Sequence, residues 1–266
     1  MEKAYDGNFA MNSPIDISTL SIDRFTLVSD SISLTLIALL VSAIFLLVNH
    51  VRVLPKYRQA IVILAMVNVI AAYHYWRLFN SFDAAHASGL RFNECYRYMD
   101  WILAVPLLLT ALVKALGFGR VTRLQLIRRL VPSAIAMVVL GYFGEMTPDT
   151  SSKLLFWVLS AIPFIYILYV LYIQVTRSLD QQVPAVVSLV ARLRVLVTVT
   201  WLVYPLSYLV PLIDLNAEMA FVWRQCGYSV ADMSAKCAFS LMIYRLARLN
   251  SAHDDPAFAE REGLND

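Results

Sequence analysis

The sequence predicts an all-α protein in which seven transmembrane helices form a bundle. Hydrophobic residues make up 59% of the 266 residues and charged residues only 15%, and the mean hydropathy is +0.64. Soluble domains carry roughly 25% charged residues. Seven apolar stretches can be marked off, each about 20 residues or longer, which is the length of a helix that crosses a bilayer. Basic residues gather in alternate connections between the stretches, as in a multi-pass membrane protein.

The seven stretches account for nearly the whole chain. They run over residues 26–49, 58–80, 95–117, 126–146, 153–176, 187–212 and 218–246. Because the connections are short, we expect one helical domain over 26–249, with an extracellular N-terminal segment over 1–25 and a solvated cytoplasmic tail over 250–266. Acids such as Glu2 and Asp6 interrupt the start. No cleavable signal peptide is therefore expected, and the first helix acts as its own insertion signal.

The charged connections predict how the bundle is oriented. Arg52, Lys56 and Arg58 separate the first two stretches, and further arginines follow the third and the fifth. The other connections are poor in Lys and Arg and contain acids such as Asp83 and Glu145. By the positive-inside rule, the N-terminus lies outside and the C-terminus lies in the cytoplasm. The three cysteines have no CxxC spacing, so neither a metal site nor a disulfide framework is expected.

Two pairs of charged residues lie inside the predicted membrane region. Asp232 and Lys236 are four residues apart, so a helix brings them to the same face. Arg97 and Asp100 share a face of the third stretch in the same way. A charge inside a bilayer is costly, and it normally pairs with another charge or lines a wet cavity. The four groups are nearly neutral as a set, so they can be buried together and mark a candidate functional site.

These residues belong to longer motifs that resemble microbial rhodopsins, the seven-helix retinal proteins. Tyr73-His74-Tyr75 and Gly141-Tyr142-x-Gly144-Glu145 are most similar to proteorhodopsins and related bacterial pumps. The resemblance covers nearly the whole membrane region. It implies a multi-pass protein of the bacterial inner membrane that is a light-driven transporter and not an enzyme. The motifs that carry it are Arg97-Tyr98-x-Asp100-Trp101-x-x-x-x-Pro106-Leu107, Asp232-x-Ser234-x-Lys236, Trp201-x-x-Tyr204-Pro205 and Trp157-x-x-Ser160.

The resemblance implies that all-trans retinal is bound to Lys236 as a protonated Schiff base. Only an unhindered amine forms an imine, and a buried protonated imine needs a counterion, which Asp100 and Asp232 would supply. Arg97 would help to keep both acids ionised. Large rigid side chains would form a slot for the flat polyene, sandwiched between two tryptophans. The expected cofactor-binding residues are Lys236, Trp101, Val105, Leu108, Met137, Gly141, Trp157, Ser160, Phe164, Trp201, Tyr204, Pro205, Tyr208 and Asp232.

The expected function is light-driven outward proton pumping, with Asp100 as the proton acceptor. His74 resembles the histidine that pairs with this acid in proteorhodopsins; it could also be a packed residue at a subunit contact. Ala104 stands where many pumps have threonine, and Ala111 stands where they have a carboxylic proton donor. Reprotonation must then come from water or from another group. Lys114 could be that group, or it could reach the cytoplasmic interface as an ordinary helix-end lysine.

Alternative functions are weighed on the same residues. Without a fast donor the deprotonated state would last longer, which would suit a slow-cycling photosensory rhodopsin that signals through a separate partner. A seven-helix protein that has lost retinal is disfavoured by the intact lysine. Asp100 argues against chloride and sodium pumping, and Asp232 argues against inward proton pumping. Arg224 resembles an extracellular-gate or subunit-contact residue, with an ordinary interfacial arginine as the alternative.

The expected partners are retinal, the lipid bilayer and further copies of the chain. The resemblance implies a pentamer, and no nucleic acid is expected. Trp157 occupies a position where antenna-binding relatives have glycine, so a carotenoid antenna is not expected. Leu108 is apolar where blue-absorbing relatives carry a polar residue, which favours absorption toward the green.

Overall fold

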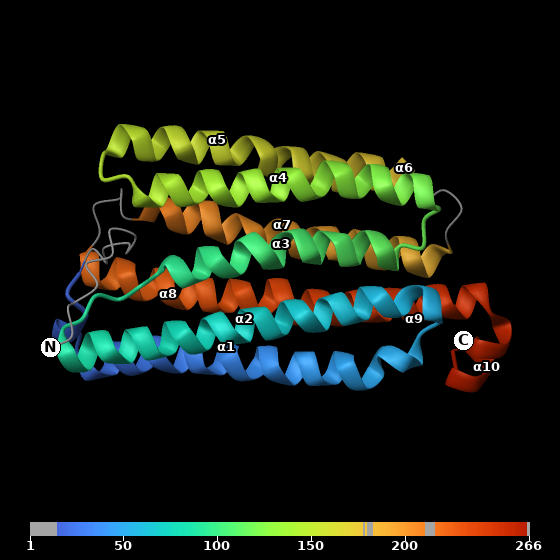
Figure 1. Cartoon of the computed structure of the whole chain (residues 1–266), viewed down its shortest axis with the longest axis horizontal. Coiled ribbons are helices and arrows are strands. Elements are labelled where there is room, and N and C mark those ends of the chain that lie inside the picture. The colour runs from blue at the N-terminus through green and yellow to red at the C-terminus, as the bar shows by residue number, and fades with distance from the viewer. Residues whose placement is uncertain (1–14, 178, 180–182, 211–215, 265–266) are drawn as a thin grey trace, which may run out of the picture.

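Long helical rods lie side by side along the length of the molecule (Figure 1). The structure is a computed structural model and describes residues 15–177, 179, 183–210 and 216–264. No strand occurs among these residues, so the all-α fold class is confirmed. The rods are α1 (Ile22–Asn49), α2 (Pro55–Ser88), α3 (Cys95–Ala115), α4 (Arg120–Met146), α5 (Thr150–Tyr169) continued by α6 (Val175–Arg177), α7 (Pro184–Leu209), and α8 (Ala217–Met233) continued by α9 (Phe239–Asp254).

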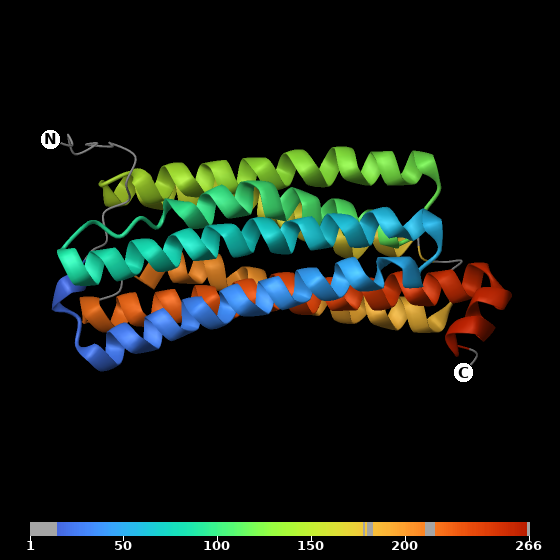
Figure 2. The same cartoon turned by 60° about the horizontal axis from the view of Figure 1, so that its bottom comes forward.

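Successive rods run in opposite directions, so the connections gather at the two ends of the bundle. The described chain starts at one end with the short helix η1 (Ile17–Thr19), and α10 (Pro256–Glu262) lies at the other end (Figure 2). A second short helix, η2 (His50–Arg52), follows α1. α3 begins after Glu94 at the first end and stops just beyond Lys114 at the second. We call these the Glu94 end and the Lys114 end of the bundle.

Several helices extend beyond the apolar stretches that predicted them. α2 continues to Ser88, past the predicted end at residue 80, and α4 begins at Arg120 instead of residue 126. Backbone hydrogen bonds continue a helix outside the apolar layer whatever the side chain, so local signals decide the ends. Pro55 stands in the first turn of α2, and Gly89 ends that helix in a left-handed conformation with φ 65°. The predicted end of the sixth stretch at residue 212 lies outside the described residues.

Six rods are long and apolar enough to cross a membrane by length and composition alone. The rod formed by α8 and α9 is not among them, because charged and polar side chains, including Asp232 and Lys236, lie in its middle. Its packing against α1 and α7 makes it the seventh helix of the bundle. The six apolar rods are Ile22–Arg52, Pro55–Ser88, Cys95–Ala115, Arg120–Met146, Thr150–Arg177 and Pro184–Leu209.

The flanks of the bundle are apolar. Leu34 is 62% exposed, Ile165 63% and Trp223 69%, and many other large hydrophobic side chains also face outward. Proteins in water rarely expose so much contiguous apolar surface, whereas a lipid bilayer solvates it. The buried polar and charged side chains lie between the rods. The chain is therefore a multi-pass membrane protein.

The C-terminal segment contains helical structure that the sequence did not predict. α9 continues to Asp254 and α10 follows it, with Phe258 only 6% exposed. Tyr57 Oη donates to Asp254 Oδ2 at 2.6 Å, and Arg52 Nε lies 3.2 Å from Glu262 Oε2. The segment is therefore helical, and some of its acidic side chains pair with groups at the Lys114 end, although most of its residues are partly or fully exposed. That it is a solvated cytoplasmic tail stays a prediction.

Two of the rods contain a π-helical turn. η3 (Val170–Gln174) joins α5 to α6, and η5 (Ser234–Ala238) joins α8 to α9. Such turns are rare and occur frequently at functional sites. η5 carries Lys236, so the wider turn lies where the charged pairs were predicted to meet.

Candidate functional site

Lys236 lies between the two predicted acids in the middle of the bundle. Its Nζ is 2.6 Å from Asp232 Oδ1 and 2.8 Å from Asp100 Oδ2. None of the three residues is more than 2% exposed. Buried ion pairs persist only where the charges balance and further hydrogen bonds satisfy them. Lys236 thus meets both acids, while the roles of these residues stay a prediction.

Asp232 is held by several hydrogen bonds besides the lysine. Its Oδ1 accepts from Trp101 Nε1 at 3.1 Å and from Tyr204 Oη at 2.6 Å. Its Oδ2 accepts from Tyr75 Oη at 2.8 Å. The donors come from α2, α3 and α7, so several rods fix the position of this one carboxylate. A carboxylate with so many donors is stabilised as an anion.

Asp100 has far fewer partners. Lys236 is the one charged residue paired with it among the described residues, and its Oδ1 accepts no hydrogen bond there. Ala104 lies one turn along α3 and offers no hydroxyl group. The two carboxylates therefore differ in their hydrogen bonds. Both oxygens of Asp232 accept hydrogen bonds, whereas Oδ1 of Asp100 is free to accept a proton.

Arg97 lies on the Glu94 side of the acids and faces Asp232. Its Nη1 is 3.9 Å from Asp232 Oδ2 and donates to Tyr75 Oη at 3.0 Å. Its Nη2 donates to Gln225 Oε1 at 2.9 Å. Among the described residues, no ion pair joins Arg97 to Asp100. The ion pair of Arg97 is thus with Asp232, and hydrogen bonds to Tyr75 and Gln225 fix the guanidinium. Its expected action on both acids stays a prediction.

A second buried charge cluster lies farther toward the Glu94 end. Arg224 Nη2 is 2.6 Å from Glu94 Oε1, and Arg224 Nη1 is 3.3 Å from Glu145 Oε1. Gln225 Nε2 donates to Glu94 Oε2 at 2.9 Å and so links this cluster to Arg97. Arg224 is 5% exposed, so the alternative of an ordinary interfacial arginine is wrong. One arginine between two carboxylates leaves an excess negative charge when both acids are ionised.

A cavity lies beside Lys236. Pockets for small molecules and cofactors are mostly apolar. Aromatic and aliphatic side chains form most of the walls. All the cofactor-binding residues predicted from the sequence line this cavity: Lys236, Trp101, Val105, Leu108, Met137, Gly141, Trp157, Ser160, Phe164, Trp201, Tyr204, Pro205, Tyr208 and Asp232.

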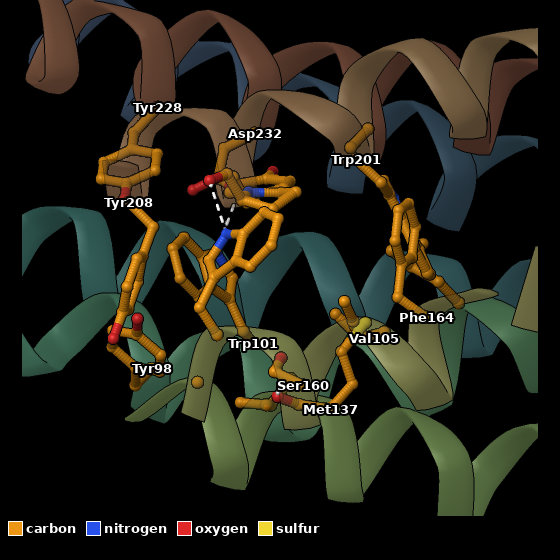
Figure 3. A pocket seen from close by; sticks show the side chains of 18 of the residues that line it. Tyr98, Trp101, Val105, Met137, Ser160, Phe164, Trp201, Tyr208, Tyr228 and Asp232 are labelled. Atoms are coloured by element: carbon orange, nitrogen blue, oxygen red, sulfur yellow. Dashed lines mark hydrogen bonds between the residues drawn. The ribbon is translucent and has the colours of Figure 1, made fainter. Parts of the chain in front are cut away.

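The side chains are distributed along the cavity, as Figure 3 shows. In this view Trp201 and Phe164 lie together at one end, Tyr208 lies toward the other, and Trp101 and Asp232 lie between them. The cavity is thus an apolar slot with its charged groups on one wall. That Trp101 and Trp201 sandwich a bound polyene stays a prediction.

Hydrogen bonds between helices fix the walls of the cavity. Trp157 Nε1 donates to Pro205 O at 3.0 Å, and Ser160 Oγ donates to Met137 O at 2.8 Å. These bonds tie α5 to α7 and to α4. A Cβ added at Gly141 would lie 3.6 Å from Ser160 Oγ, an ordinary contact, so helix packing does not require this glycine. Its missing side chain leaves space in the cavity instead.

Two further predicted residues make no hydrogen bond or ion pair with Asp100, Asp232 or Lys236 in the described part of the chain. His74 Nδ1 is buried and has no hydrogen-bond partner among the described residues, and its ring packs edge-on against Tyr73 at 5.2 Å between centroids. No hydrogen bond joins His74 to Asp100, so that pairing stays a prediction. Lys114 Nζ donates to Gln59 Oε1 at 2.9 Å. This contact at the Lys114 end favours the alternative of a helix-end lysine.

Sequence reasoning missed several residues that the structure brings to the site. Spacing could have found two of them. Glu94 is three residues before Arg97, and Gln225 is seven before Asp232, so each lies on the face of its helix that carries the charge. Tyr75 gives no such signal because its partners lie on other helices. The residues that also line the cavity are Tyr98, Val138, Ala161, Tyr228 and Ala235.

The arrangement is suited to a flat apolar molecule that carries an aldehyde. The primary amine of Lys236 can form an imine with an aldehyde, with loss of water. The positive charge of a protonated imine would be balanced by Asp100 and Asp232. Among the described residues, no group of three His, Cys, Asp or Glu side chains could hold a metal ion.

Known proteins with similar sequences match most of the chain. Residues 26–250 match a family model described as bacteriorhodopsin-like protein. The green-light absorbing proteorhodopsin of Gamma-proteobacterium EBAC31A08 is 26% identical over 220 residues, which cover 81% of this chain and 84% of that protein. The bacteriorhodopsin of Haloterrigena sp. (strain arg-4) is 26% identical over 191 residues, 71% of this chain and 75% of the relative.

Solved structures show the same helical architecture. A thermophilic rhodopsin superposes with a TM-score of 0.85 at 34% sequence identity, covering 88% of this chain and 98% of its own. Xanthorhodopsin, described as a light-driven ion pump with dual chromophore, superposes with a TM-score of 0.84 at 35% identity, covering 92% and 98%.

Proposed function

Because the chain belongs to the bacteriorhodopsin-like family of microbial rhodopsins, we propose that it is a light-driven outward proton pump. Proteins of this family bind retinal covalently through a lysine and are not enzymes. Lys236 is the lysine that lines the cavity. Retinal bound there as a protonated Schiff base absorbs light and supplies a light-driven change of shape beside the nitrogen.

The chemistry of the cavity fits this cofactor. The walls are apolar and mostly aromatic, and the single lysine stands beside two acids that can balance one positive charge on its nitrogen. Asp232 and Lys236 supply the charged wall, and the remaining lining residues would hold the polyene and the ring. Leu108 lies in this lining, which supports absorption toward the green.

Asp100 is the proposed acceptor of the proton that leaves Lys236 Nζ. The 2.8 Å between Nζ and Asp100 Oδ2 is within the reach of a proton transfer. The unoccupied Oδ1 of Asp100 leaves this acid able to take a proton without breaking another bond. Asp232 would stay ionised, because Trp101, Tyr204 and Tyr75 already donate to it. This difference between the two acids carries the proposal. His74, with its unpartnered Nδ1, would assist Asp100.

The Glu94 end is proposed to face the outside of the cell. The basic connections lie at the opposite end, as the positive-inside rule requires of the cytoplasmic side. From Arg97 a continuous chain of hydrogen bonds and ion pairs runs through Gln225 and Glu94 to Arg224. A proton released from Asp100 toward this end would meet polar groups along the way. Residues 1–25 would then be extracellular and residues 250–266 cytoplasmic.

The assembly of the protein is proposed from its surface and from the resemblance. Tyr73 and Trp76 are 50% and 53% exposed beside His74 on α2, and they would contact a neighbouring copy in a homo-oligomer, with a pentamer expected. Trp157 lines the cavity where a carotenoid would need space, so no carotenoid antenna is proposed.

The test is the light-induced change of pH in an unbuffered suspension of cells that express the protein with retinal. Illumination should acidify the medium, and a protonophore should abolish the change. The matched variant Asp100→Asn should give no acidification at the same amount of coloured protein. Alkalinisation by the wild type, or a signal that survives the protonophore, would contradict the outward assignment.

A photosensory function is the second candidate, favoured by one observation. Ala111 is fully buried where a carboxylic donor would speed the return of the proton. A slow return suits a signalling state held for a separate partner. Recovery of the visible absorbance far slower than about a second after a flash, together with no change of medium pH, would favour the sensor over the pump.

A further inference from the structure

One polar cluster interrupts the apolar packing on the Lys114 side of Lys236. Asn68 of α2 and Ser240 of α9 are both 0% exposed. Asn68 Nδ2 donates to Ser240 Oγ at 3.1 Å and to Leu64 O at 2.8 Å. Cys237 of η5 directs its Sγ to Asn68 Oδ1 at 3.7 Å. We call Asn68, Cys237 and Ser240 the Asn68 cluster.

The cluster keeps hydrogen-bonding capacity that its own members do not use. An amide oxygen can accept two hydrogen bonds, and Asn68 Oδ1 receives only the weak thiol contact. The Ser240 hydroxyl accepts from Asn68 but donates to no group among the described residues. Ser42 of α1 lies beside the Cys237 thiol, and its Oγ has no partner of good geometry there. Buried polar groups are normally satisfied, and an ordered buried water needs two to four such partners.

The cluster lies next to Lys236, on the side opposite the acids. Cys237 is the next residue along the chain, and Ser240 is one turn farther toward the Lys114 end. Asn68 is seven residues before Tyr75, which donates to Asp232, so it lies about 10 Å along α2 from that contact. Around this position the buried side chains of α3 are apolar, among them Leu108 and Ala111.

We propose that the Asn68 cluster positions the water through which Lys236 Nζ recovers its proton from the Lys114 end. The inference rests on the proposed pump. For each proton that leaves Nζ for Asp100, one proton enters from water at the Lys114 end, and the cluster residues end each cycle unchanged. They are positioning residues, because an amide, a thiol and a hydroxyl can orient water without giving up a proton themselves. Water-mediated contacts of this kind are nearly as strong as direct ones.

The test is the rate at which the visible absorbance recovers after a flash in purified, retinal-loaded protein. Asn68→Leu removes the amide at similar size and should slow recovery about tenfold, equivalent to about 1.4 kcal/mol on the barrier. Sodium azide, a small diffusible proton carrier, should restore the rate, which a packing defect would not allow. The matched control is Thr35→Val, which removes a buried hydrogen bond to Ser229 on the Glu94 side and should leave recovery within twofold of wild type.

A second pair of variants keeps the proposal falsifiable if Asn68→Leu does not fold. Ser240→Ala should slow recovery in the same direction, and Ser240→Ala/Ala111→Asp should recover faster than Ser240→Ala because a carboxyl donor bypasses the cluster. Recovery within twofold of wild type in the single variants that fold, or slowing that azide does not reverse, would overturn the proposal. Failure of the pump is separate: it would appear as absent acidification by the wild type, whatever the recovery rates.

Discussion

The two sides of Lys236 differ in the polarity of their buried side chains. On the Glu94 side, Arg97, Gln225, Glu94 and Arg224 form a buried, connected polar network. On the Lys114 side, apolar side chains fill the space between the rods, and the Asn68 cluster is a small polar island. A charge buried in a low-dielectric interior needs partners nearby. Removing one of the charged side chains on the Glu94 side should therefore cost about 3–5 kcal/mol of stability, the usual cost of breaking a buried ion pair. The second side holds few groups that can carry a proton.

This contrast separates the two halves of the proposed transport cycle. The outgoing proton would find its proposed acceptor, Asp100, within 2.8 Å and polar groups beyond it. The returning proton would meet no carboxylic donor at Ala111 and would depend on water. Changes on the Glu94 side should therefore affect stability and proton release, whereas changes on the Lys114 side should affect the rate of return. The following variants test that division, from the largest expected effect to the smallest.

Lys236→Ala should have the largest effect, because it removes the amine to which retinal would attach. Retinal could no longer attach covalently, so reconstitution with all-trans retinal should give none of the visible absorbance of the wild type. The control Lys114→Ala changes a lysine that bonds Gln59 at the end of the bundle and should colour normally. Equal colour in the wild type and Lys236→Ala would remove this lysine from its central role.

The two acids should respond differently to loss of charge. Asp100→Asn should abolish light-driven acidification while the protein remains folded, because Asp100 makes few contacts. Asp232→Asn should instead lower the free energy of unfolding by about 3–5 kcal/mol, because it removes a buried negative charge that pairs with Lys236 and Arg97. The measurements are medium pH under light and the temperature at which colour is lost. Retained pumping by Asp100→Asn would contradict its role as acceptor.

Arg224→Gln tests whether buried ion pairs stabilise the Glu94 side of the bundle. Removing this guanidinium leaves Glu94 and Glu145 uncompensated, and we expect a loss of about 3–5 kcal/mol in the free energy of unfolding. Arg24→Gln breaks the ion pair to Glu218 near the same end, where both side chains are about one-third exposed, and should cost less than about 1 kcal/mol. Similar losses in both variants would mean that burial does not set the cost.

Glu262→Gln should have the smallest effect. It breaks the pairs that hold α10 to Arg52 and Arg248, which lie 3.2 and 3.1 Å from the carboxylate. Partly exposed pairs of this kind contribute about 0–1 kcal/mol, so colour, pumping and recovery rate should stay close to wild type. Faster proteolysis of residues beyond 254 is the expected change. An altered recovery rate would show that α10 also acts on the proton path.

Part of the site could be predicted because its signals are local. Asp232 and Lys236 lie four residues apart on one helix, so helical periodicity was sufficient to pair them. The cavity residues were predicted from the resemblance of longer motifs to microbial rhodopsins. The sequence did not predict α10 or the ion pairs of residues 250–264, where acidic side chains suggested a solvated tail. Their partners, such as Arg52 and Tyr57, are about 200 residues away in the chain, and no local pattern records such a pairing.

By itself, then, the sequence determined the all-α class, the membrane-spanning stretches and the two pairs of charged residues inside them, and its resemblance to a known family indicated the residues of the apolar cavity. Only the tertiary structure decided how the two acids differ, which of them faces Arg97, and that Asn68 meets Ser240. Those properties depend on which side chains of separate helices come within about 3 Å of each other. Helical periodicity determines the face on which a side chain lies, but the packing of the seven rods determines its partner.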